Sequence, residues 1–78
     1  MRDRIVSGEA IRARRLGLLM TQKDLAAEVG LALSYIKYVE GGRCQPSDIN
    51  ARRIANILHC EVEDFSTPKP VDVSGSAA

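Results

Sequence analysis

Residue types suited to catalysis, metal binding and cross-linking are scarce in this sequence of 78 residues. The two cysteines, Cys44 and Cys60, are too few for a disulfide framework, and we interpret both as reduced, half-buried thiols. His59 is the only histidine, so no Cys or His pair has the spacing of metal ligands. Because adjacent residues point in different directions, His59 and Cys60 are not a Cys/His dyad. Without a glycine-rich phosphate loop or a carboxylate pair, we expect no enzymatic activity, no metal and no cofactor.

A long apolar run is also missing. No stretch is long and apolar enough to span a bilayer, and no apolar run of a signal peptide follows the charged residues 1–8. We therefore expect a soluble, cytoplasmic protein without a membrane partner. A chain of 78 residues forms one small domain with little core to spare, which favours compact helices and oligomerisation.

The sequence has no strong excess of charge of either sign, and its formal net charge is +1. The distribution of charge is uneven, however. Residues 1–43 contain eight Lys or Arg and five Asp or Glu, whereas residues 44–78 contain three and five. The mild basic excess therefore lies in the part of the chain that also contains the most informative motif. Attraction of phosphate groups requires an excess of this sign.

That motif is the stretch Thr21–Glu40, whose pattern predicts two short helices around a tight corner. Gly30 lies where the chain must turn, and glycine tolerates the positive φ that a corner often requires. Ala26 is small, which lets the second helix pass close to the first. This layout is typical of a helix-turn-helix, whose second helix enters the major groove of DNA. The apolar residues of the two helices are Leu25, Ala26, Val29, Ile36 and Val39.

Capping residues indicate where the helices begin and end. Ser7, Thr21 and Ser47 are suitable N-caps, because their hydroxyls accept hydrogen bonds from free helical N–H groups. Asp24 follows Thr21 at the spacing of a capping box, although Glu or Gln is more usual there. Two glycines directly after Glu40 stop the third helix. The expected helices cover residues 7–18, 21–30, 32–40 and 47–59, with a short fifth turn or helix at 62–65.

These elements predict an all-α domain over residues 7–65, built as a compact bundle of four to five short helices. Residues 1–6 are expected to form a charged N-terminal arm. Residues 66–78 contain prolines and little apolar surface to bury, which predicts a disordered C-terminal tail.

Several short motifs stand along residues 7–65 in a characteristic order and spacing. The motifs are Ile11-Arg12, Arg15, Thr21-Gln22, Leu25-Ala26, Gly30, Ser34-Tyr35-Ile36, Glu40, Gly42, Pro46-Ser47, Ile54-Ala55 and Leu58. Together they resemble the Cro/C1-type helix-turn-helix domains, or XRE family, of phage repressors and Cro proteins, over about residues 7–65. The resemblance implies a lambda-repressor-like fold with the helix-turn-helix formed by the second and third helices.

The same resemblance implies contacts to the DNA backbone. Thr21 and Gln22 stand where relatives contact the sugar-phosphate chain, and a helix N-terminus offers phosphate free N–H groups and a positive dipole end. Thr21 alternatively acts only as a cap, and the two roles are compatible. Tyr35 stands at a position that often reaches phosphate through its hydroxyl, and Arg43 lies in the loop where backbone contact is usual.

The third helix is expected to read the bases. Lys37 can donate to guanine O6 and N7. Ala32 stands where Ser or Thr usually caps this helix, and Leu33 stands where a polar base reader is common. Leu33 can contact thymine methyl groups or, alternatively, a protein partner. The expected base-reading residues are Ala32, Leu33, Ser34, Lys37 and Tyr38.

In relatives, an Arg and a Glu at the positions of Arg15 and Glu40 form an ion pair inside the domain. We therefore expect these two residues to be structural. Arg12 and Arg14 are expected to be solvated, with phosphate contact as the alternative.

The resulting hypothesis is a small, sequence-specific regulator of transcription. It would bind double-stranded DNA at an inverted repeat, as a nucleoid-associated repressor.

No long C-terminal dimerisation helix is visible, so we expect a weak homodimer that strengthens on DNA. It would use His59, Val62 and Phe65, or the N-terminal arm. The alternative is a protein-interaction module that kept the fold, for example an antitoxin-like or partner-dependent regulator.

Overall fold

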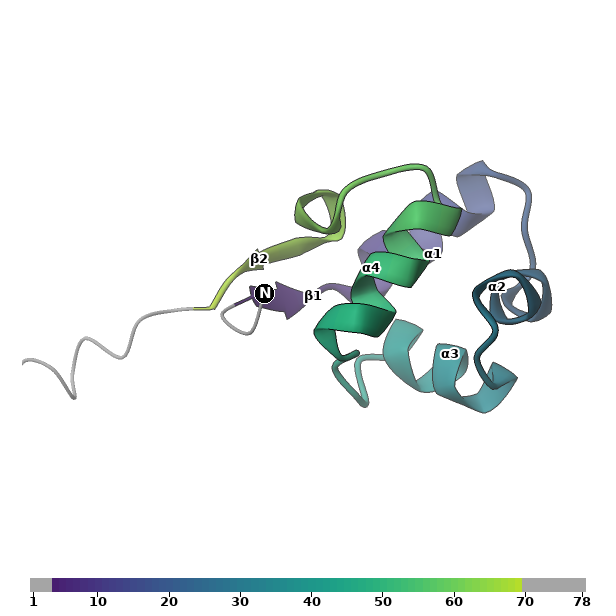
Figure 1. Cartoon of the computed structure of the whole chain (residues 1–78), viewed down its shortest axis with the longest axis horizontal. Helices are drawn as coiled ribbons and strands as arrows, with labels where there is room; N and C mark the ends of the chain where they lie inside the picture. Colours follow the sequence, from purple (N-terminus) through teal and green to yellow (C-terminus); the bar gives the residue numbers. More distant parts are fainter. Residues whose placement is uncertain (1–3, 70–78) are drawn as a thin grey trace, which may run out of the picture.

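The computed structural model describes residues 4–69, which form a helical bundle with a short two-stranded sheet at one end (Figure 1). The all-α fold class is confirmed, with four α-helices and one 3-10 helix among these residues. The elements are β1 (Arg4–Val6), α1 (Gly8–Gly17), α2 (Gln22–Val29), α3 (Leu33–Glu40), α4 (Asp48–Ile57), the 3-10 helix η1 (Val62–Phe65) and β2 (Ser66–Pro68).

The three N-caps expected from the sequence are confirmed. The Ser7 hydroxyl accepts from the Ala10 N–H at 3.1 Å, and the Ser47 hydroxyl accepts from the Asn50 N–H at 3.2 Å. Thr21 and Asp24 form the full capping box, with both hydrogen bonds at 2.9 Å. Hydrogen bonds with Thr21 lower the pKa of Asp24, because they favour the ionised carboxylate. The backbone N–H of Thr21 has the larger effect and its hydroxyl the smaller.

The core lies where α1, α2, α3 and α4 meet. α2 packs against both α3 and α4, and α1 packs against α3. Gly30 ends α2 with a φ of 80°, the left-handed conformation that the corner of the helix-turn-helix requires. The largest fully buried side chains are Ile11, Leu25, Ile36, Val39, Ile54 and Leu58.

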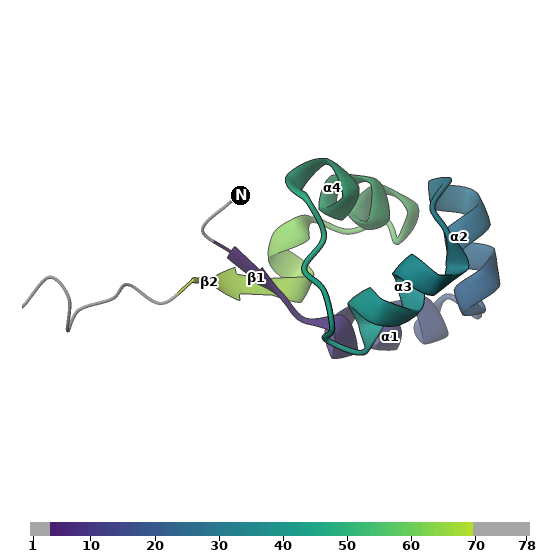
Figure 2. The same ribbon diagram turned by 90° about the horizontal axis from the view of Figure 1, so that it is seen from below.

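The two ends of the domain are joined by β-structure that the sequence did not predict. β1 pairs antiparallel with β2, with Ile5 opposite Thr67 (Figures 1 and 2). The expectation of an arm over residues 1–6 is therefore wrong for 4–6, and that of disorder over 66–78 is wrong for 66–68. The Arg4 guanidinium adds a hydrogen bond to the Ser66 hydroxyl at 2.7 Å. Lys69 follows β2 outside any element and is exposed, and residues 1–3 and 70–78 lie outside the described residues.

The outer edge of β1 is occupied by a side chain from the loop after α3. The Gln45 carbonyl oxygen accepts from the Val6 N–H at 2.8 Å, and the Gln45 amide donates to the Val6 carbonyl at 3.0 Å. A primary amide thus takes the place of a neighbouring strand. On β2, Pro68 has no N–H to offer. Neither edge presents the open row of polar groups that invites pairing with another chain.

Arg14 is not simply solvated, as the sequence led us to expect. Its guanidinium donates to the carbonyl oxygens of Leu58 at 3.0 Å and His59 at 2.9 Å. These carbonyls follow the last turn of α4, where backbone acceptors lack helical partners. Arg14 therefore ties α1 to the C-terminal end of α4. Arg12 is exposed, as expected.

Leu19 is in an unfavourable conformation for its residue type. Its φ is 59°, and 92% of the residue is exposed. The left-handed region costs an L-residue roughly 1–2 kcal/mol, and glycine avoids that cost. We expect Leu19→Gly to stabilise the fold by about 0.5–1 kcal/mol, because almost no burial is lost and the entropy cost of glycine offsets part of the gain. Urea unfolding measures the change, and a lower midpoint for the variant would contradict the interpretation.

Candidate nucleic-acid interface

The outward face of α3 is a continuous exposed surface. α3 runs along one side of the bundle and lies uncovered when viewed from that side (Figure 2). Ile36, Val39 and Glu40 point inward and are buried. The helical period therefore leaves four residues on the opposite face, and all four are exposed: Leu33, Ser34, Lys37 and Tyr38. Leu33 is 37% exposed and Tyr38 is 49% exposed, so two of the four residues offer a large apolar surface.

The N-terminal end of α3 has no polar cap. Ala32 is the exposed N-cap residue, and no side chain accepts a hydrogen bond from the first turn. The five residues expected to read bases thus lie together, on α3 and at its start. Among the hydrogen bonds of residues 4–69, none uses the side chain of Ser34, Lys37 or Tyr38, so these groups are available to a ligand.

The N-terminus of α2 carries two backbone donors that the capping box does not use. The N–H groups of Thr21 and Asp24 are taken by the box, and that of Leu25 bonds to the Thr21 carbonyl. The N–H groups of Gln22 and Lys23 precede the first helical hydrogen bond and have no partner within the helix. Both lie at the positive end of the helix dipole, which favours an anion there.

Arg15 and Glu40 form the ion pair that the resemblance implied. Arg15 Nε donates to Glu40 Oε2 at 2.7 Å, and Nη2 donates to Oε1 at 2.9 Å. Both residues are buried. The hydrogen bond with Glu40 raises the pKa of Arg15 above its ordinary value, against the opposing effect of burial. Glu40 Oε1 also accepts from the Gln22 side-chain amide at 3.1 Å, and Arg15 Nη1 donates to the Met20 carbonyl at 2.7 Å.

This network has a consequence for the interface. It joins α1, the loop before α2, the first residue of α2 and the last residue of α3. The angle between α2 and α3 is therefore fixed by polar contacts as well as by apolar packing. Because the Gln22 side chain is engaged internally, its free backbone N–H is the group best placed for an external anion.

Tyr35 and Arg43 occupy different surroundings. The Tyr35 hydroxyl accepts a hydrogen bond from the Asn50 amide at 3.1 Å, which links α3 to α4 and leaves the hydroxyl hydrogen free to donate. Nothing in the sequence pointed to Asn50. Arg43 is exposed in the loop after α3, and Gly42 in this loop has a φ of 76°. A 2.8 Å hydrogen bond from the Arg43 N–H to the Tyr38 carbonyl closes the turn.

Two of the residues expected to form a dimer surface are inside the protomer. Val62 and Phe65 are buried, because η1 packs both side chains against the core, and only His59 of the three is exposed.

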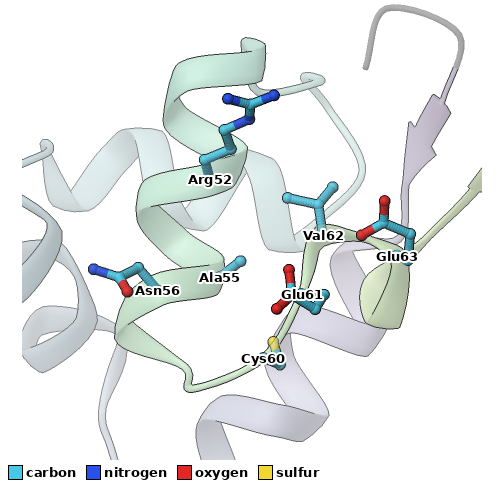
Figure 3. A pocket seen from close by; sticks show the side chains of 7 residues that line it. All are labelled: Arg52, Ala55, Asn56, Cys60, Glu61, Val62 and Glu63. Atoms are coloured by element: carbon cyan, nitrogen blue, oxygen red, sulfur yellow. The ribbon is translucent and has the colours of Figure 1, made fainter.

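A pocket of about 340 Å³ opens between α4 and the segment leading into η1 (Figure 3). Burial raises the pKa of the Cys60 thiol in its wall, so the thiol is protonated at neutral pH. The lining residues are Arg52, Ala55, Asn56, Cys60, Glu61, Val62 and Glu63.

Comparison with known proteins places the chain in a family. A family model described as "Helix-turn-helix" (HTH_3) matches residues 11–65, which span α1 to η1. The chain belongs to this family. It is of the XRE, or Cro/C1, type, and the protein is a DNA-binding transcriptional regulator. No curated protein sequence matches the chain.

Three solved structures illustrate the similarity. The restriction-modification controller protein C.AhdI from Aeromonas hydrophila is 32% identical, with a TM-score of 0.71 over 73% of this chain and 86% of that chain. The DNA-binding domain of the phage P22 C2 repressor is also 32% identical, with a TM-score of 0.69 over 72% and 74%. Hydroxypropylphosphonic acid epoxidase from S. wedmorenis has a TM-score of 0.73 over 87% and 37%. Its identity of 22% shows a shared fold alone.

In the part of the chain that the structure describes, no helix has the length and apolarity needed to cross a bilayer. Within the same residues, no group of three His, Cys, Asp or Glu side chains is arranged to hold a metal ion.

Proposed function

We propose that this helix-turn-helix protein is a sequence-specific repressor that places α3 in the major groove of duplex DNA and binds an inverted repeat as a dimer. The observation that supports this proposal is the exposed face of α3, whose polar side chains have no internal partner, next to two unused N–H groups at the start of α2. Such an arrangement can contact base edges and phosphates at the same time. The base-reading residues of the proposal are Ala32, Leu33, Ser34, Lys37 and Tyr38.

Phosphate contacts would set the position of the protein on the duplex. The Gln22 N–H lies at the positive end of the α2 dipole, and Thr21 precedes it. The Tyr35 hydroxyl can donate its remaining hydrogen to a phosphate oxygen while accepting from Asn50. Arg43 adds a full positive charge at the far end of α3. These four residues carry no sequence information themselves, because phosphates are the same at every step.

The test is selection of sites from a random duplex pool with the purified protein at two salt concentrations. An enriched inverted repeat with half-sites about one helical turn apart, and an affinity that falls steeply with salt, supports the proposal. An enriched single half-site contradicts the dimer, and no enrichment contradicts sequence-specific binding.

Two substitutions separate the roles of base readers and phosphate contacts. We expect Arg43→Ala to weaken binding equally on selected and unrelated duplexes and to reduce the salt slope by about 1. Lys37→Ala should cost about 1–3 kcal/mol on the selected site and much less on unrelated DNA, because a base-edge contact is lost. Fluorescence anisotropy titrations at several salt concentrations measure both effects. Arg53→Ala, which removes an exposed charge from α4, is the matched control and should change little.

The pocket between α4 and the segment leading into η1 supports a dimer of weak affinity. Arg52 lies on α4, whereas Glu61 and Glu63 lie on the following segment (Figure 3). A two-fold axis lets each copy present its basic wall to the acidic wall of the other. Such exposed ion pairs contribute little individually, so the free dimer is weak and DNA strengthens it by holding two copies together.

A charge reversal tests this dimer. We expect Arg52→Glu to weaken self-association on the selected duplex, because it replaces attraction by repulsion on both sides of the two-fold axis. The double variant Arg52→Glu with Glu61→Arg should restore part of it. Sedimentation velocity with and without DNA measures the assembly. A tight dimer at nanomolar concentration without DNA, or an unchanged Arg52→Glu variant, would refute the proposal.

A protein-interaction module is the second candidate function. The exposed apolar side chains of Leu33 and Tyr38 favour it, because such surface also suits a protein partner. The double variant Lys37→Ala with Arg43→Ala, which removes two exposed side-chain charges proposed to contact DNA, distinguishes the two functions. The Arg15–Glu40 pair remains in this variant, so the fold should persist while retention on a DNA column is lost. Unchanged retention would favour the protein-interaction role.

A further inference from the structure

The N-terminal end of α3 presents apolar rather than polar side chains. Leu33 is the first residue of the helix and is 37% exposed, and the exposed Ala32 precedes it. More than a third of Leu33 is thus open to solvent, and the exposed residue that follows it, Ser34, carries a hydroxyl. The first polar group of full charge on the face is Lys37, four residues later.

Base edges offer few partners to such a side chain. In the major groove, guanine and adenine present nitrogen and oxygen acceptors or amino donors, and cytosine presents an amino donor. A leucine placed against these groups removes them from water without replacing their hydrogen bonds, which is unfavourable. The C5-methyl group of thymine is the apolar exception.

We infer that Leu33 is a specificity-determining residue that reads the C5-methyl group of a pyrimidine, normally thymine, in each half-site. This inference rests on the proposed function, because it assumes that α3 enters the major groove. The relevant ligand class is a 5-methylpyrimidine, so that 5-methylcytosine offers the same methyl group as thymine.

The spacing on the helix sets where the methyl group should lie. Leu33 and Lys37 are four residues apart, which corresponds to about 6 Å along the helix axis. Successive bases on one strand are separated by about 3.4 Å along the duplex. A recognition helix lies in the major groove, across the duplex axis rather than along it, so the helical rise does not convert directly into a number of base pairs. The thymine contacted by Leu33 and the guanine contacted by Lys37 should therefore be near neighbours within one half-site.

Replacement of thymine by deoxyuridine tests the inference, because it removes the methyl group and keeps every hydrogen-bonding group. Each thymine of the selected site is replaced in turn, and affinity is measured for the wild-type protein and for Leu33→Ala. Burial of one methyl-sized group corresponds to about a four-fold change in affinity. We expect this loss for the wild type at one thymine per half-site, near a guanine, and no loss at the same position for Leu33→Ala.

Two further measurements complete the test. Leu33→Gln keeps a long side chain but adds an amide, and it should also lose the dependence on the methyl group. Thermal unfolding of both variants should match the wild type, because Leu33 lies outside the core. Equal wild-type affinity for every deoxyuridine duplex overturns the inference and leaves sequence-specific binding intact. A methyl dependence that persists in Leu33→Ala assigns the contact to another residue and also overturns it. If selection enriches no site, the proposed function and this inference fail together.

Discussion

Gly8→Ala is expected to destabilise the domain by about 3 kcal/mol or more, which lies at or beyond the upper end of ordinary overpacking. Gly8 is the first residue of α1 and lies directly against the last turn of α3. A Cβ atom at this position would lie 2.7 Å from the Glu40 carbonyl carbon and closer still to the carbonyl oxygens of Val39 and Glu40. These atoms belong to the backbone, so no side chain can rotate away and the two helices must separate.

Circular dichroism during heating measures this effect. For a domain of this size, a loss of 3 kcal/mol lowers the melting temperature by more than about 12 °C. Gly17→Ala is the matched control, because Gly17 is the last residue of the same helix and an added Cβ would meet nothing within 4 Å. The free energy of unfolding of that variant should rise by about 0.5–1 kcal/mol, because alanine has a better helix propensity than glycine. Equal stability of the two variants would show that α1 and α3 do not approach each other this closely.

Features governed by local chemistry were predictable from the sequence. Ser7, Thr21 and Ser47 precede helical patterns, and a hydroxyl at that point accepts from an N–H group only three residues away. The turn at Gly30 follows equally from the requirement for positive φ. Such contacts depend on residues within one turn, so the surrounding fold changes them little.

Features that depend on distant backbone groups were not predictable in the same way. β1 and β2 are each three residues long, which is too short for an alternating pattern to appear, and they lie about sixty residues apart in the sequence. Arg14 bonds to carbonyl oxygens, which every residue possesses, and Gln45 bonds to the backbone of Val6. Asn50 was missed as a partner of Tyr35 for a similar reason, since an amide pairs with many groups and its spacing from Tyr35 follows no local rule. The Arg15–Glu40 pair was reached only through resemblance to a family.

The second large effect concerns that buried pair. Replacing Arg15 by Met or Glu40 by Leu should each destabilise the domain by about 3–5 kcal/mol, because the remaining charge stays buried without its partner. Each residue also makes a second contact, Glu40 with the Gln22 amide and Arg15 with the Met20 carbonyl, so each single variant loses one further hydrogen bond. Urea unfolding at neutral pH measures each variant.

The double variant, Arg15→Met with Glu40→Leu, should recover most of the lost stability. Both charges are then absent, and apolar side chains of similar volume often replace a buried pair without net cost. The two single effects are therefore expected to be strongly non-additive, with a coupling of about 3 kcal/mol or more. Additive losses would mean that the pair behaves like an exposed one and contributes little.

DNA affinity should not recover with stability in the double variant. Gln22 loses its acceptor on α3, and the Met20 carbonyl loses its contact with Arg15, so the start of α2 is no longer tied to the end of α3. A small shift there would misalign a phosphate contact and leave the apolar core intact. We expect stability close to that of the wild type with a weaker affinity on the selected duplex, measured by anisotropy. Full recovery of both stability and DNA affinity would show that packing alone sets the angle between α2 and α3. The polar network would then serve only to keep its own charges paired.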